Sequence, residues 1–116
     1  MKKRNKNVGD ILTDKHSKNK SFWFWCPGCN SYHSIVFERP TKKFIGEDGK
    51  EYKNKGPTWE FNGDLIKPTV KPSIKTWWGP KEEPERNLCH SRVTDGEIRF
   101  LKDCTHKLKG QTVKLR

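Results

Sequence analysis

Cysteine and histidine gather at three places in this chain, with spacings that suit a metal site. The first is Cys26-Pro27-Gly28-Cys29, where two thiolates two residues apart can point into one tetrahedral site while the amides of the turn face their sulfur atoms. The others are Cys89-His90 and Cys104-Thr105-His106. Because zinc prefers thiolate and imidazole ligands, the sequence predicts a domain stapled by one Zn²⁺ ion per chain.

Strand alternation limits which of these side chains can share one metal ion. Neighbouring residues of a strand face opposite sides, so Cys89 and His90 are not expected to bind the same ion. If residues 104–106 are extended, Cys104 and His106 lie on one face, and both could reach the site. The predicted ligands are Cys26, Cys29, Cys89 and His106, with Cys104 and His90 as alternates.

Two other uses of the cysteines compete with metal binding. A redox pair of the form Cys-x-x-Cys usually lies where a strand opens a long helix, and no helical period follows Cys29. Four cysteines could also form two disulfides, but reducing compartments disfavour them. The spacing beside several histidines therefore favours a metal.

The composition indicates one small domain that needs such a staple. With 116 residues the chain fits a single core, but only 30% of them are hydrophobic while 34% are charged. No stretch approaches the roughly 20 apolar residues that span a bilayer, and no apolar signal-peptide core follows the basic N-terminus. The sequence predicts a cytoplasmic protein with no membrane contact.

Aromatic runs and turn signals predict a mainly β fold. The run over residues 22–25 has high strand preference, and Trp59-Glu60-Phe61 alternates before Asn62-Gly63, a pair suited to a tight turn. Asp95-Gly96 is the clearest hairpin signal, whereas four prolines exclude a helix over residues 64–87. We expect a small antiparallel zinc-ribbon-like domain built from hairpins, with little helix.

The net charge of +11 is concentrated at the two ends of the chain. Residues 1–20 carry seven basic and two acidic side chains and have few apolar groups, so they are predicted to form a flexible basic arm before a domain over residues 21–116. Basic ends attract polyanions, although they also serve as solvated tails. The predicted partner is a nucleic acid or a host protein complex, contacted through Lys2, Lys3, Arg4, Lys6, Trp77 and Trp78.

Several separated motifs over residues 26–113 resemble a family of small phage and prophage proteins of unknown function. These motifs are Cys26-Pro27-Gly28-Cys29 with His33, Trp59-Glu60-Phe61-Asn62-Gly63, Lys67-Pro68-Thr69, Lys71-Pro72-Ser73, Cys89-His90, Asp95-Gly96, Asp103-Cys104-Thr105-His106 and Gly110-Gln111-Thr112-Val113. The resemblance implies zinc binding without a reaction. Members often carry the label ammonia monooxygenase, which a thiolate-rich site does not support.

Two functions remain open from the sequence. The leading hypothesis is a zinc-binding accessory module of phage type that acts in the host cytoplasm on a nucleic acid or a macromolecular complex. The alternative is a metal-dependent hydrolase or nuclease with an open zinc position, in which His33, His90 or Asp103 handles the proton. The ordinary alternative for His33 and His90 is a satisfied hydrogen-bonding role. Asp103 could orient a nearby histidine or be a surface carboxylate.

Overall fold

Ten strands make up the fold in the computed structural model, which describes residues 6–78 and 87–116. They are β1 (Gly9–Thr13), β2 (Lys20–Cys26), β3 (Ser31–Glu38), β4 (Lys43–Ile45), β5 (Glu51–Lys53), β6 (Glu60–Phe61), β7 (Val70–Trp78), β8 (Asn87–Thr94), β9 (Glu97–Phe100) and β10 (Thr112–Lys114). All strand pairs are antiparallel.

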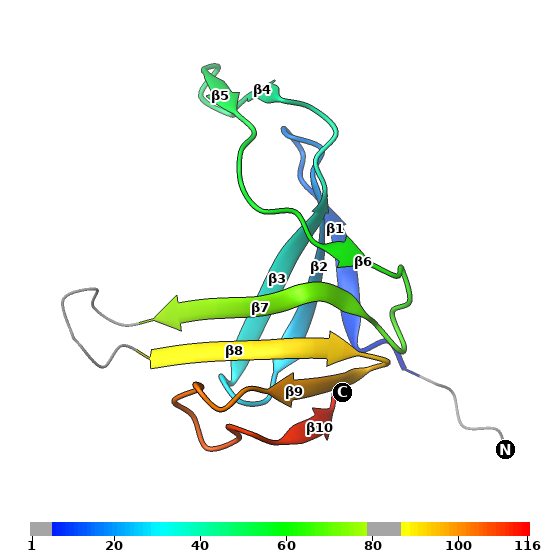
Figure 1. The fold of residues 1–116 in the computed structure, drawn as a ribbon. Helices are drawn as coiled ribbons and strands as arrows, with labels where there is room; N and C mark the ends of the chain where they lie inside the picture. The colour runs from blue at the N-terminus through cyan, green and yellow to red at the C-terminus, as the bar shows by residue number, and fades with distance from the viewer. Residues whose placement is uncertain (1–5, 79–86) are drawn as a thin grey trace, which may run out of the picture.

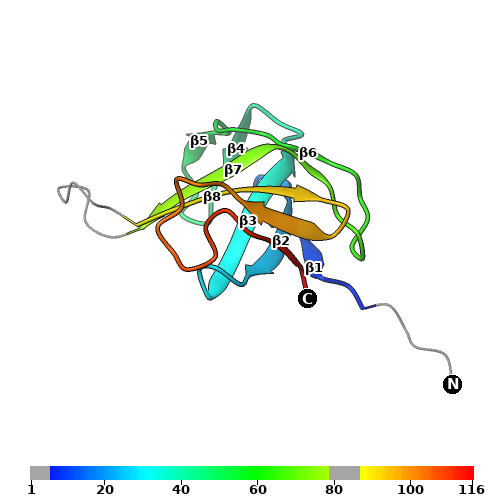
Figure 2. The ribbon, with the colours of Figure 1, turned by 60° about the horizontal axis from the view of Figure 1, so that its bottom comes forward.

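Two sheets lie face to face and enclose the core. One has the strand order β1-β2-β3 and the other the order β10-β9-β8-β7-β6, while β4 and β5 form a separate hairpin. Figures 1 and 2 show the strands of the two sheets crossing at a steep angle, with the β4–β5 hairpin extending away from them. This is the orthogonal form of sheet packing, in which the inner faces of both sheets form one apolar layer.

Residue alternation decides which side chains enter that layer. On β2 every second residue is fully buried, namely Phe22, Phe24 and Cys26. On β8 the buried stripe includes Cys89 and Val93, so the residues between them face the opposite side of the sheet. The core stripes of both sheets therefore end in cysteines, next to phenylalanine, isoleucine and valine side chains.

The predicted fold class is confirmed. The described residues form strands and turns with no helix, and the hairpin predicted at Asp95-Gly96 is present. Within residues 64–87, where the prolines argue against a helix, the structure has the strand β7 from Val70 to Trp78. In the part of the chain that the structure describes, no helix has the length and apolarity needed to cross a membrane.

The predicted flexible arm over residues 1–20 is wrong for residues 9–13, which form β1. This strand pairs with β2 over the whole of its length, from Gly9 opposite Phe24 to Thr13 opposite Lys20. The pairing depends on the free edge of a distant strand, which a local hydrophobic pattern does not reveal. Lys6 is exposed, whereas Lys2, Lys3 and Arg4 lie outside the described residues.

The turn between β8 and β9 is fixed by neighbouring loops. Asp95 and Gly96 both have positive φ angles, 49° and 79°, as the tight hairpin requires. The Gly96 amide donates to the Pro68 carbonyl at 3.0 Å, and the Asp95 amide donates to the Thr69 hydroxyl at 3.0 Å. The hairpin that carries Cys89 and His90 is thereby tied to the start of β7.

We predict that Gly96→Ala destabilises the domain by about 1–3 kcal/mol, because the left-handed backbone is unfavourable for alanine and the site is crowded. A Cβ at Gly96 would lie 3.2 Å from the Ile66 carbonyl oxygen. Gly49→Ala is the matched control, since Gly49 has a similar φ of 77° but no atom within 4 Å of such a Cβ. Urea unfolding should show a larger loss for Gly96→Ala, and equal losses would contradict this prediction.

Candidate functional site

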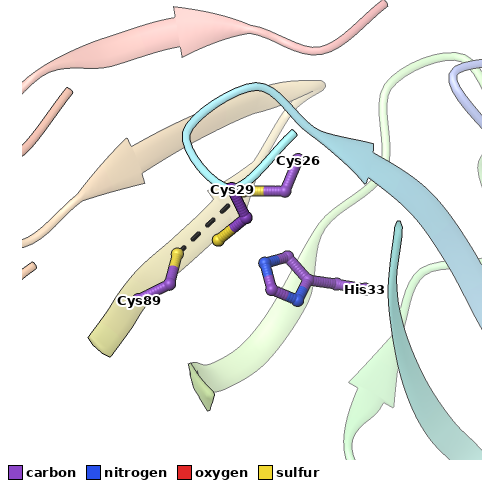
Figure 3. Close-up of side chains that lie close together, drawn as sticks. All are labelled: Cys26, Cys29, His33 and Cys89. Carbon is purple, nitrogen blue, oxygen red and sulfur yellow. Dashed lines mark hydrogen bonds between the residues drawn. The ribbon is translucent and has the colours of Figure 1, made fainter. Parts of the chain in front are cut away.

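Three cysteines and one histidine come together where the core stripes of the two sheets meet. The ligand atoms of Cys26, Cys29, His33 and Cys89 all lie within 4.8 Å of one another, and three of these residues are buried. Figure 3 shows the His33 ring facing the three sulfur atoms. The group can hold a metal ion, and its three thiols with one imidazole match the donor types of structural zinc sites.

Four chain segments supply these side chains. Cys26 ends β2, and Cys29 follows in the turn, which is closed by the Asn30 amide donating to the Cys26 carbonyl at 2.9 Å. His33 occupies an inward position of β3, and Cys89 an inward position of β8. The site therefore joins the three-stranded sheet to the five-stranded sheet through residues far apart in sequence.

The electrostatics of the thiols favour occupation by a cation. The Cys26 and Cys89 sulfur atoms are 4.0 Å apart, and the hydrogen bond from Cys89 lowers the pKa of Cys26 to about 4. The same interaction raises the pKa of Cys89 far above its usual range, and burial raises the pKa of Cys29 to about 12. One thiolate forms readily, but three in contact require a positive ion to balance their charge.

Two histidine rings lie near the thiols, that of His33 buried and that of His106 partly buried. His33 Nε2 and His106 Nε2 are both buried and have no hydrogen-bond partner among the described residues, and His33 Nε2 belongs to the ring that lies with the three thiols. His106 Nδ1 accepts a hydrogen bond from the Leu108 amide at 3.2 Å. A neutral imidazole carries one proton, so this bond leaves the His106 proton on Nε2 and makes that atom a donor. Burial also lowers the pKa of His106, which favours the neutral ring.

The structure brings together three of the four predicted ligands. Cys26, Cys29 and Cys89 are brought together, but His33 completes their group in the place predicted for His106. His106 instead shares a second group with Cys89 and Cys104, within the same 4.8 Å limit. Residues 102 and 103 form a turn and residues 104–106 belong to no strand, yet Cys104 and His106 both reach Cys89. The ring of His106 packs over the turn at Gly28, where a Cβ would clash with it.

A pocket opens beside the metal group and gives Trp77 and Trp78 a place in the structure. Both indoles are partly exposed at the end of β7. The residues that line the pocket are Cys29, Ser31, Tyr32, His33, Ser34, Thr76, Trp77 and Trp78. The two tryptophans predicted to contact a partner thus border the metal group.

A second constellation occupies the opposite face of β8. The Ser73 hydroxyl oxygen lies 2.9 Å from His90 Nε2, and His90 Nδ1 lies 3.0 Å from an Asp103 carboxylate oxygen. The arrangement assigns the ring proton to Nδ1, which donates to Asp103 and leaves Nε2 to accept the Ser73 proton. Serine, histidine and aspartate therefore form a continuous hydrogen-bonded relay.

Alternation and a strand irregularity create this relay. His90 and Cys89 are neighbours on β8, so the inward position of Cys89 directs His90 to the outer face. Between Val70 and Ile74 the register of β7 shifts, and Ser73 lies in this irregular stretch with its carbonyl accepting from the Trp59 indole at 3.2 Å. A β-bulge re-aims side chains locally, and here it directs the partly buried Ser73 side chain toward His90.

Cys104 holds the backbone of the histidine. Its sulfur accepts a hydrogen bond from the His90 amide at 3.2 Å and donates to the His90 carbonyl at 3.1 Å. The Leu101 amide donates to the same carbonyl at 2.9 Å. Because Cys104 follows Asp103 directly, one turn of chain fixes both the His90 backbone and the carboxylate that orients the His90 ring.

The relay has the geometry that activates a serine for nucleophilic attack. In such a triad the histidine removes the serine proton while the carboxylate stabilises the imidazolium that forms. Triads are recognised by these distances and roles, because their chain order differs between folds. The side chains of His90 and Asp103 are 21% and 47% exposed, so a substrate can reach them.

The sequence singled out two members of the relay and missed the third. His90 and Asp103 were candidates for proton transfer, and the structure pairs them, whereas His33 lies apart in the metal group. Ser73 lacks a local signature such as Gly-x-Ser-x-Gly. Its position in the Lys71-Pro72-Ser73 motif of the resemblance was the available signal.

The family match agrees with this second constellation. A family model described as bacterial ubiquitination-like system serine protease (BubE) matches residues 2–101. The chain belongs to the BubE family. No curated protein and no solved structure matches the chain.

The BubE match covers Ser73, His90 and the four residues of the metal group, while Asp103 lies just beyond it. Its description names a bacterial ubiquitination-like system. It supports neither the phage origin nor the oxygenase label that came with the resemblance. The chain is therefore a β-rich member of the BubE family with a cysteine-histidine group that can hold a metal ion.

Proposed function

We propose that this protein is a serine peptidase of a bacterial ubiquitination-like system, with Ser73 as nucleophile, His90 as general base and Asp103 as the group that orients it. The relay of hydrogen bonds at 2.9 Å and 3.0 Å carries this proposal. The description of the BubE family supports it independently. Because ubiquitination joins proteins by amide bonds, the substrate is a peptide or isopeptide bond of a protein in that system.

The geometry suits acyl transfer in two steps. His90 Nε2 takes the Ser73 proton as the serine oxygen bonds to the substrate carbonyl carbon, and the imidazolium then gives that proton to the departing amine. The acyl group stays on Ser73 as an ester. Water then attacks this ester with His90 again as base, which releases the acid and restores the serine. Asp103 remains ionised and stabilises the imidazolium in both steps.

For the metal group we propose one zinc ion held by Cys26, Cys29, His33 and Cys89. Four protein donors fill a tetrahedral site, so this zinc serves stability rather than the activation of water. The role as a metal-dependent hydrolase loses its basis, because His90 and Asp103 engage Ser73 on the other face of β8. The metal instead holds Cys89 and, through the peptide bond, the adjacent base.

Nucleic-acid binding by the basic ends stays a prediction beside this function. Lys6 is exposed and Trp78 borders the pocket described above, which leaves them available to a partner. Under the proposed function, a protein substrate is the first partner to test.

Replacing Ser73 by alanine should abolish hydrolysis, with a loss of at least about 10³-fold in kcat, because the nucleophile is removed. Thermal unfolding should stay close to that of the unchanged protein, since the serine lies on the outer face. Ser34→Ala removes an exposed hydroxyl from β3 and is the matched control. The activity of both variants can be measured by labelling with a fluorophosphonate and by hydrolysis of p-nitrophenyl acetate. Labelling that persists in Ser73→Ala would refute the assignment.

Cys104 should act as a positioning residue for His90. Cys104→Ala removes both hydrogen bonds to the His90 backbone and should lower kcat about tenfold with little change in KM. Cys104→Ser keeps a donor and an acceptor, so it should restore most of the rate. Zinc content measured in both variants tests for a ligand role. Loss of zinc from both variants, or equal rates in the two, would contradict a positioning role.

The two histidines beside the thiols, His33 and His106, provide a matched test of the metal ligands. His33→Ala should lower the zinc content below one per chain and destabilise the domain by several kcal/mol, because metal binding and folding are coupled. His106→Ala should retain the zinc, since its Nδ1 hydrogen bond makes Nε2 a donor. Elemental analysis and thermal unfolding measure these effects. Zinc lost from His106→Ala but kept in His33→Ala would reverse the assignment.

A further inference from the structure

The outer face of the five-stranded sheet carries a cationic patch beside the relay. On β8, His90 and Arg92 are two residues apart, so they share this face. Arg92 lies directly opposite Arg99 of β9, and both are exposed. Lys75 of β7 lies opposite His90 on the same face. The triad is therefore bordered by a pair of arginines that point the same way.

This arginine pair is unfavourable unless something neutralises it. Residues directly opposite on antiparallel strands have Cβ atoms about 5 Å apart, and like charges there repel. Within residues 6–78 and 87–116, neither arginine forms an ion pair. Glu97 is on the same face, but its register partners are Thr94 and Lys114. Two neighbouring arginines without an acidic partner among the described residues favour the binding of an external anion.

We infer that this arginine pair, Arg92 and Arg99, binds an acidic stretch of the substrate on the leaving-group side of the bond that is cut. His90 must protonate the departing amine, so the leaving segment begins above β8. Arg92 lies about 7 Å further along the same strand, a span of about two residues of extended chain. A carboxylate near that position meets two guanidinium groups at once. This inference rests on the proposed peptidase function, because that function defines the bond that is cut.

An acidic peptide fits better than a nucleic acid because the patch surrounds a relay suited to acyl transfer. Guanidinium groups bind carboxylates through paired hydrogen bonds, so two arginines side by side suit closely spaced glutamate or aspartate residues. Lys75 is already placed over the Trp77 ring, at 5.2 Å from its centroid. The arginine pair therefore provides most of the available charge.

Binding can be tested apart from catalysis. Fluorescein-labelled hexaglutamate should bind the Ser73→Ala protein, as measured by anisotropy, and hexaglutamine should bind at least about tenfold more weakly. The added changes Arg92→Gln and Arg99→Gln should weaken hexaglutamate binding about tenfold. Lys43→Gln with Lys53→Gln is the matched control, because these lysines also lie opposite each other on neighbouring strands, away from the relay. That control should keep the affinity.

Cleavage by the active protein gives the second measurement. In a peptide library, the sites cut should be enriched in acidic residues after the scissile bond, and the Arg92→Gln/Arg99→Gln protein should lose that enrichment. Sites cut without acidic enrichment would overturn the inference while leaving the peptidase intact. Absence of both cleavage and fluorophosphonate labelling would refute the proposed peptidase function. Hexaglutamate binding would then be the test of whether the arginine pair binds an acidic peptide. A single-stranded oligonucleotide that binds more tightly than hexaglutamate and depends on both arginines would overturn it in favour of nucleic acid.

Discussion

The contact between Cys26 and Cys89 is the constraint on which the rest of the structure depends. These residues are 63 positions apart and come from different sheets, yet their sulfur atoms are 4.0 Å apart. The chain is only 30% hydrophobic, so a thin apolar layer has to hold two crossing sheets together. A cation bound to the thiols and to His33 would fix β2, β3 and β8 at one point and reduce the entropy that folding has to overcome.

The same strand then serves two sites by simple alternation. Cys89 faces inward to the thiol group, and its neighbour His90 faces outward to Ser73. The segment after β9 divides its contacts in a similar way. Asp103 orients the His90 ring, and its neighbour Cys104 holds the His90 backbone. Both sites therefore share the rigidity of one strand, and a shift of Cys89 would move His90 relative to Ser73.

Local sequence patterns predict only part of the fold and of the two sites. Spacing and alternation are properties of short segments. They predict the turn between Cys26 and Cys29, the Asp95-Gly96 hairpin and the opposite directions of Cys89 and His90. The fourth residue of the metal group depends on how the sheets cross, and β1 depends on a free edge of β2. Ser73 depends on a register shift in β7. Such features arise from tertiary contacts between distant segments, which a single sequence does not encode locally.

The exposed relay also bears on the kind of substrate this scaffold suits. Ser73, His90 and Asp103 lie on the outer face of a sheet and contribute little to the core, so their hydrogen-bonded relay does not weaken a small domain. An open face of this kind encloses little of a short peptide. Recognition then has to come from contacts spread over the surface, which a folded partner provides better than an isolated side chain.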